Sequence, residues 1–192
     1  NVTTEVNNLH TRFSYNLESR ILSAYYDSQG LLYFGTHGGG VMVLDLRERF
    51  YERFCQNETN EICDIVSDDK GNIWLATFHG EILCSDSPFE SSESLNFSPK
   101  NIPIVEGKAV LCAMKDADGN LWFGNSDASI TCYQSFSGKF VNYNLPVEYR
   151  ENNNLKYSTY VWQLFIDSKR RFWVGTRNGL LRFDLNTKAF SP

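Results

Sequence analysis

The chain has 192 residues and a formal net charge of −5, with 15% aromatic and 21% charged residues. This length is enough to bury a substantial core, and the acidic balance argues against a nucleic-acid partner, which would attract a basic stripe. Apolar stretches fall short of the roughly 18 residues that a membrane-spanning helix needs, so we expect membrane attachment only through segments outside this chain.

One sequence pattern recurs four times along the chain. In each copy an apolar strand ends at an aspartate, a four-residue turn follows, and an aromatic residue stands six positions after the aspartate. The aromatic residues lie 41, 48 and 51 positions apart, which is typical of β-propeller blades and excludes the shorter solenoid repeats. These residues, which we expect to pack between blades, are Tyr33, Trp74, Trp122 and Trp173.

Each copy predicts a series of short strands. In the first copy they are residues 21–26, 31–36, 41–46 and 50–54. The turn between the first two strands ends with glycine because that position needs a positive φ, and only the fourth copy departs, with Arg170. The outer strand of the second copy stays uncertain. The later copies place the first strand at 62–67, 110–115 and 161–166, the second at 72–77, 120–125 and 171–176, the third at 81–86, 129–134 and 180–185, and the outer strand at 139–143 and 188–192.

A four-stranded antiparallel sheet of this size is not stable alone, so neighbouring sheets must pack face to face. The predicted fold is therefore an all-β propeller with four recognisable four-stranded blades. The blades span approximately residues 20–54, 61–97, 109–143 and 160–192. Residues 1–19 are expected to supply the outer strand of a preceding blade and a connector.

The shared pattern D-x-x-G-x-[LI]-[WY]-x-[GA]-T-x-x-G-[LIV] resembles the two-component regulator propeller repeat. Four copies in register cover most of residues 20 to 190. The departures are Tyr33 in place of tryptophan, Arg170 in place of glycine, and residues 125–129, where the third copy lacks the T-x-x-G ending. They affect single blades and leave the resemblance to the family intact.

The resemblance implies that this chain, residues 1–192, is part of a larger propeller of about seven blades. Such propellers form the periplasmic sensor region of bacterial hybrid two-component systems, ahead of a membrane span and a histidine kinase. The implied function is recognition of polysaccharide-derived oligosaccharides, with binding changing how two receptor copies sit against each other. The chain itself would not be an enzyme, and the histidine kinase would lie outside it.

The turn at Asp116 also resembles the start of a calcium loop. A calcium loop needs glutamate at the twelfth position, which here is Asp127, and the equivalent turns lack the second aspartate. We therefore predict an ordinary hairpin, with no metal and no cofactor.

Five cysteines cannot all pair with one another, and no spacing gives a CxxC pair. Cys84 and Cys132 align with Val43 and Phe183 in the third strands. Cys63 aligns with residues 22, 111 and 162 in the first strands, and both sets are predicted to be core positions where cysteine acts as a small apolar residue. Cys55 and Cys112 are less clear, and a disulfide stays open if the compartment is oxidising.

Catalysis has no positive support in the sequence. The three histidines are His10, His37 and His79, and no Ser-His-Asp or Cys-His grouping carries a family signature. An alternative propeller lyase or hydrolase would use His37 or His79 as a general base with a carboxylate beside it. A second alternative is a non-catalytic propeller that docks other proteins.

Ligand binding is expected at the turns between second and third strands, which in a propeller share one face with the connectors between blades. Their chemistry varies while the frame repeats, although the same side chains could also be ordinary solvated turn residues. Two long connectors, residues 85–108 and 144–159, add groups that could stack on or pair with a sugar. The candidate ligand-binding residues are His37, Phe78, His79, Asp127, Arg177, Asn178, Tyr149 and Arg150. We also expect the chain to self-associate as a dimer, because terminal blades expose apolar faces and strand edges.

Overall fold

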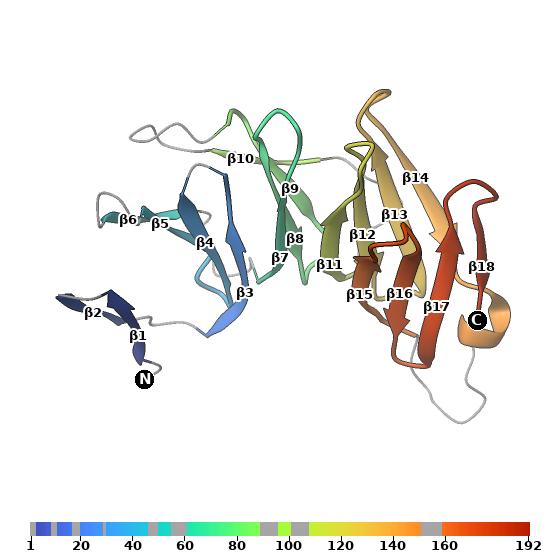
Figure 1. Cartoon of the computed structure of the whole chain (residues 1–192), viewed down its shortest axis with the longest axis horizontal. Helices are drawn as coiled ribbons and strands as arrows, with labels where there is room; N and C mark the ends of the chain where they lie inside the picture. Colours follow the sequence, from blue (N-terminus) through green and yellow to red (C-terminus); the bar gives the residue numbers. More distant parts are fainter. Residues whose placement is uncertain are drawn as a thin grey trace.

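The computed structural model describes residues 3–8, 11–16, 20–28, 30–45, 50–54, 61–88, 96–100, 108–150 and 159–192. Within them the chain forms four antiparallel sheets of four strands each and one two-stranded sheet, with a single one-turn helix. The four sheets stand side by side like successive blades (Figure 1). The all-β propeller architecture expected from the sequence is confirmed.

Each blade is a simple meander in which sequential strands are neighbours. Blade one contains β3 (Ile21–Tyr26), β4 (Leu31–Thr36), β5 (Val41–Asp45) and β6 (Phe50–Phe54). Blade two contains β7 (Ile62–Ser67), β8 (Ile73–Thr77), β9 (Ile82–Ser85) and β10 (Phe97–Pro99); blade three contains β11 (Val110–Lys115), β12 (Leu121–Asn125), β13 (Ser129–Gln134) and β14 (Lys139–Asn144); blade four contains β15 (Val161–Ile166), β16 (Phe172–Thr176), β17 (Gly179–Asp184) and β18 (Ala189–Ser191).

A strand pair and a short helix lie outside this four-blade frame. Strands β1 (Thr3–Asn8) and β2 (Thr11–Asn16) pair with each other in an antiparallel hairpin near the N-terminus. The short helix α1 (Val147–Arg150) lies in the connector from blade three to blade four, where the sequence suggested only a long loop.

The first strands of the blades contact one another in order, β3 with β7, β7 with β11 and β11 with β15. Each pair of neighbouring blades therefore has its own apolar core. One cluster joins blades one and two, a second joins blades two and three, and a third joins blades three and four. Stability thus comes from blade-to-blade packing, as in other repeat proteins.

After the turns of blades one, two and three, the aromatic residue lies in these interfaces. Tyr33, Trp74 and Trp122 are buried, and the Trp122 ring packs against Phe172 and Phe183 of the next blade at centroid distances of 5.0 and 5.5 Å. In blade four the equivalent Trp173 is only half-buried, because no described residues cover that face. The expected packing between blades is confirmed for Tyr33, Trp74 and Trp122.

The aspartate that opens each turn is held by hydrogen bonds from its own hairpin. Asp116 Oδ1 accepts from the N–H groups of Asp118 and Asn120, both at 2.9 Å. Asp116 Oδ2 accepts from Asn120 Nδ2 at 3.0 Å and from Trp122 Nε1 at 2.8 Å. Both oxygens are therefore engaged by protein donors, which explains the residue as part of a hairpin and not of a calcium loop.

One strand register differs from the sequence alignment. Trp173 pairs with Arg182, whereas Trp74 and Trp122 pair with Cys84 and Cys132. Arg182, and not Phe183 as the alignment suggested, is therefore the equivalent of the two cysteines. The hairpin turn between β16 and β17 is one residue shorter than in the other blades, and a shift of one residue turns each side chain to the opposite face.

The cysteine positions divide into two kinds. Cys84, Cys112 and Cys132 are buried with free thiols, and burial raises the pKa of Cys84 to about 11 and of Cys132 to about 12. Cys63 also has a free thiol but is only half-buried, and Trp162 at the equivalent position is 51% exposed. The expectation that this first-strand position belongs to the core was wrong, because a bulge after the first residue of each strand turns it outward. Cys55 lies outside the described residues.

Candidate functional site: the turn face

The turns between second and third strands lie beside the points where the chain enters each blade. In every blade the first residue of this turn donates its N–H to a carbonyl just before the first strand. The bonds are His37 to Arg20 at 2.9 Å, Phe78 to Glu61 at 2.9 Å, Ser126 to Ala109 at 2.9 Å, and Arg177 to Tyr160 at 3.1 Å. The turns and blade entries therefore share one edge of the molecule, the lower edge in Figure 1, which we call the turn face.

At the turn of blade one, His37 meets an acidic residue of blade two. His37 Nε2 lies 3.1 Å from Glu61 Oε1, with the His37 side chain 52% exposed. The contact becomes an ion pair when His37 is protonated. It joins two successive blades across the turn face.

At the turn of blade two, Phe78 and His79 present two exposed rings. Phe78 is 49% exposed, and its ring meets that of His79 edge-on at a centroid distance of 5.9 Å. Thr77 underneath closes the turn by donating to the Glu81 carbonyl at 2.8 Å. A rigid hairpin thus carries an exposed apolar surface at its tip.

At the turn of blade three, Asp127 pairs with Lys108 from the entry of the same blade at 2.7 Å. Its other oxygen accepts from Ser129 Oγ at 2.5 Å. Asn125, which replaces the usual threonine, donates to Ser129 Oγ at 3.0 Å and to Thr131 Oγ1 at 2.8 Å. These hydrogen bonds hold the turn in place of the missing T-x-x-G ending. The departure seen in the sequence therefore leaves the blade intact.

At the turn of blade four, Asn178 binds the connector that precedes the blade. Asn178 Nδ2 donates to Thr159 Oγ1 at 2.6 Å and to the Tyr149 carbonyl at 3.2 Å. Thr159 is buried and donates in turn to the same Tyr149 carbonyl. The network fixes helix α1 against the turn of Arg177, whose side chain is exposed.

The expected residues are thus arranged in groups along the turn face. Tyr149 and Asn178 are brought together through Thr159, whereas His37, Asp127 and the ring pair each belong to a different blade. The side chain of Arg150 lies outside the described part of the chain. Sequence reasoning missed the residues at the blade entries that pair with the turns, namely Glu61, Lys108 and Thr159. The sequence feature that could have identified these residues is their location immediately before the first strand of a copy.

Nowhere in the described ranges do three His, Cys, Asp or Glu side chains gather as they would around a metal ion. The one helix in the same ranges is too short to cross a membrane.

Comparison with known proteins gives a matching family model and a curated relative. The family described as "Two component regulator propeller" matches residues 105–127. Histidine kinase P4 of Formosa agariphila is 26% identical over 181 residues, which cover 91% of this chain and 13% of that protein. The chain therefore spans a small part of the length of this curated relative.

Solved structures share the fold. The extracellular domain assigned to the hybrid two component system BT4673 of B. thetaiotaomicron has 19% identity and a TM-score of 0.71 over 93% of this chain and 23% of that chain. The corresponding domain of BT3049 has 25% identity and a TM-score of 0.63 over 93% of this chain and 24% of that chain. Streptogramin B lyase shares the fold alone, with 17% identity and a TM-score of 0.65 over 92% of this chain and 56% of that chain. The resemblance expected from the sequence is confirmed for residues 105–127, which match the two component regulator propeller model, and the chain folds as a segment of a β-propeller.

Proposed function

We propose that this chain is part of the periplasmic sensor propeller of a hybrid two-component histidine kinase. Its task is recognition, and the phosphorylation chemistry belongs to a kinase domain elsewhere in the receptor. The observation that carries the proposal is the contrast between a frame repeated in four blades and a turn face whose exposed chemistry differs in every blade. A scaffold that presents a specific binding surface has this property.

The ligand class we propose is a polysaccharide-derived oligosaccharide. The exposed Phe78 ring offers an apolar platform for the carbon face of a sugar. The Asp127–Lys108 and His37–Glu61 pairs provide acceptors and donors for hydroxyl groups on either side. Binding across several blades would change how the blades, and hence two receptor copies, sit against each other.

The test is calorimetric titration of the 192-residue chain with neutral and acidic oligosaccharides. Phe78→Ala is expected to weaken binding by about tenfold or more, the equivalent of losing one good contact. Tyr26→Ala, which removes another exposed aromatic ring on blade one, serves as the matched control and should bind as the wild type. Equal affinity of the Phe78→Ala variant and the wild type would overturn the assignment of the turn face.

A second candidate function is supported by the His37–Glu61 contact. A histidine beside a carboxylate is what a propeller lyase or hydrolase would need as a general base. Incubation with the oligosaccharides that bind, followed by mass spectrometry of the sugars, separates the two functions. Turnover that disappears in His37→Ala would favour the enzyme, whereas unchanged sugars support the sensor.

A further inference from the structure

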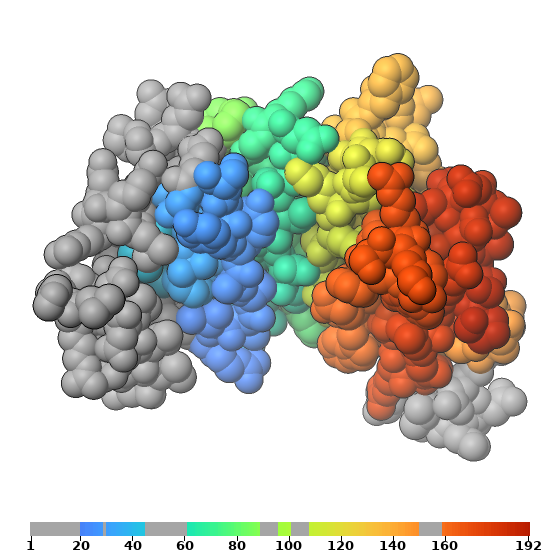
Figure 2. Space-filling view, in the orientation of Figure 1, coloured from blue at the N-terminus to red at the C-terminus, as the bar shows by residue number. Residues whose placement is uncertain are grey.

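A groove runs between blades two and three at the edge opposite the turn face. It has a volume of about 850 Å³ and is lined by hairpin turns of the two blades together with residues of strands β8, β9, β13 and β14. A second cavity of about 350 Å³ lies beside it, between blades three and four. Phe136, at the tip of the β13–β14 turn, lines both cavities and its side chain is completely exposed. In Figure 2 the molecule is hollowed along its upper edge between blades two and three.

The wall of the larger groove is aromatic. Tyr133 and Phe140 of blade three pack at a centroid distance of 5.0 Å, and Tyr133 lies 4.6 Å from the Trp74 ring of blade two. Trp74 Nε1 already donates a hydrogen bond to Asp68 Oδ2 at 3.1 Å. Trp74 itself is buried, so the partly exposed rings of Tyr133 and Phe140 present the carbon surface of the wall, with Phe136 as an exposed ring at its end.

The rim of the groove carries both signs of charge. Lys100 Nζ lies 5.7 Å from the centre of the Trp74 ring, and Lys70 lies on the turn of blade two. Asp118 lies opposite, on the turn of blade three. Asp68, Asp69 and Asp86 line the groove as well, so carboxylates outnumber the two ammonium groups along it.

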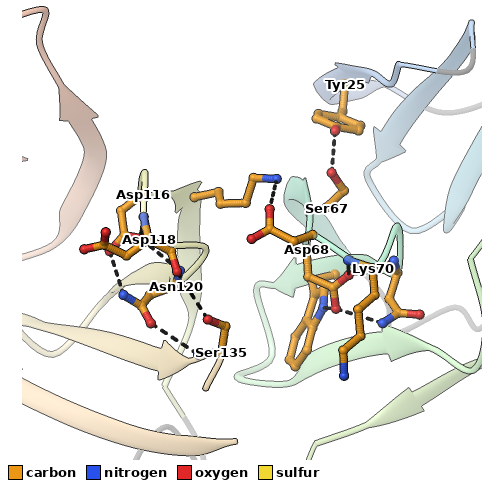
Figure 3. Close-up of polar contacts among 12 residues, drawn as sticks. Tyr25, Ser67, Asp68, Lys70, Asp116, Asp118, Asn120 and Ser135 are labelled. Carbon is orange, nitrogen blue, oxygen red and sulfur yellow. Dashed lines mark hydrogen bonds and ion pairs between the residues drawn. The ribbon is translucent and has the colours of Figure 1, made fainter. Parts of the chain in front are cut away.

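The turns that carry these groups are held in place. Asp69 of blade two pairs with Lys115 of blade three at 2.9 Å, which joins the two turns across the blade interface. Asn120 Oδ1 accepts from the N–H of Ser135 at 3.2 Å, which ties the β13–β14 turn to the turn of Asp118. Figure 3 shows these polar contacts on both sides of the groove. A groove whose walls are set in advance loses little free energy to ordering when a ligand binds.

We propose that this groove is a second ligand site, and that it binds a neutral oligosaccharide with one pyranose ring stacked on Phe136. The carbon face of a sugar fits an exposed aromatic ring, and its hydroxyl groups can donate to Asp118 and accept from Lys70. A neutral polyol can hydrogen-bond to both groups, whereas an anionic sugar would be repelled by the carboxylates that outnumber the ammonium groups along the groove. The adjoining smaller cavity gives room for a further sugar unit beyond Phe136.

This inference goes beyond the proposed function, because the groove lies on the opposite edge from the turn face. Both flanking blades belong to the described chain, so the site is complete without any further blade. Binding here requires none of the turn-face residues.

The experiment is nuclear magnetic resonance titration of the ¹⁵N-labelled 192-residue chain with maltotetraose, cellotetraose and xylotetraose. We expect at least one of them to shift the amide signals of residues 135–138 in a saturable way. Phe136→Ala should weaken this binding by about tenfold or more, whereas Phe136→Trp keeps the platform and should retain it. Phe136 is fully exposed, so both variants are expected to fold.

Two controls keep this site separate from the turn face. Phe78→Ala should leave the shifts of residues 135–138 unchanged, and Tyr26→Ala should do the same. The inference is overturned if none of the three sugars shifts these amides, or if Phe136→Ala binds as tightly as the wild type. Failure at the turn face alone, with residues 135–138 still responding, would contradict the proposed function and support this second site.

Discussion

The last residue of each hairpin turn has a backbone conformation that favours glycine. Gly30, Gly71 and Gly119 have positive φ angles at the end of the turn, and Arg170 at the equivalent position has a φ of 59°. An L-residue other than glycine tolerates this region only at a cost of about 1 kcal/mol. The sequence predicted this requirement from the glycine in three copies, and the fourth copy meets it with strain.

Replacing that arginine should stabilise the protein. We expect Arg170→Gly to raise the free energy of unfolding by about 0.5 to 1 kcal/mol, measured by urea denaturation. The control is Lys169→Gly, one position earlier, where no positive φ is required and glycine adds only freedom to the unfolded chain. A lower stability of Arg170→Gly than of the wild type would contradict the account.

Buried thiols should make stability depend on alkaline pH. Burial raises the pKa of Cys132 from its ordinary 9.0 to about 12, so between these values the unfolded chain releases a proton that the folded chain keeps. Stability is therefore full below the unfolded pKa and is lost as the pH rises toward the folded pKa, by at most about 1.4 kcal/mol per pH unit for one thiol. Urea denaturation at several alkaline pH values should give a shallower loss for Cys132→Ala. Ser137→Ala, exposed and without a titrating group, should keep the wild-type slope, and an unchanged slope in Cys132→Ala would refute the argument.

At the scale of strands and blades, close backbone approach sets the contact between neighbouring sheets. A Cβ added at Gly124 of β12 would lie 2.5 Å from Cys112 Sγ and 2.6 Å from Val161 Cγ1 of blade four. The equivalent Gly175 of β16 has no atom nearer than 3.5 Å, because no described residue covers blade four. An added side chain would therefore clash at this glycine position in blade three but would fit at the equivalent position in blade four.

This difference gives a matched pair of variants. Gly124→Ala should lower the free energy of unfolding by about 1 to 3 kcal/mol, because it pushes blades three and four apart. Gly175→Ala should stay within about 0.5 kcal/mol of the wild type. Denaturant unfolding of both variants measures the difference, and equal losses would mean that the blade interface is not packed as described.

Most of the strands could be predicted because apolar and aromatic residues alternate between clear turn signals. The first strands of all four blades begin and end where the sequence placed them. Strand β10 and helix α1 were not predicted, since both are short and lie in connectors with no repeat pattern. The register of β17 was mispredicted because one residue fewer in a turn is invisible to an ungapped alignment.

The candidate site was predictable only in part. The turn positions followed from the repeat, but their partners Glu61, Lys108 and Thr159 did not, because pairing across a blade entry depends on three-dimensional contact. The groove at Phe136 had no sequence signal at all. An exposed aromatic residue at a hairpin tip becomes informative only once the neighbouring blade is seen beside it.

At the scale of the whole molecule, the outer face of blade four has consequences for association. Trp162, Phe165 and Leu180 of this blade are 51%, 57% and 58% exposed. Exposed apolar side chains of this kind favour pairing with another copy. We propose that the isolated chain self-associates through this face. Light scattering across micromolar concentrations should detect a dimer that Phe165→Lys disrupts, and a wild-type monomer throughout would contradict this expectation.

We propose that this propeller segment senses a saccharide for a histidine kinase. The most direct measurement is autophosphorylation of the full receptor in membrane vesicles, with and without an oligosaccharide that binds the chain. We predict that the sugar changes the rate of phosphorylation, and that Phe78→Ala removes this response while leaving the basal rate intact. A phosphorylation rate that does not change when the sugar binds would contradict this proposal. An undiminished response in Phe78→Ala would contradict it as well.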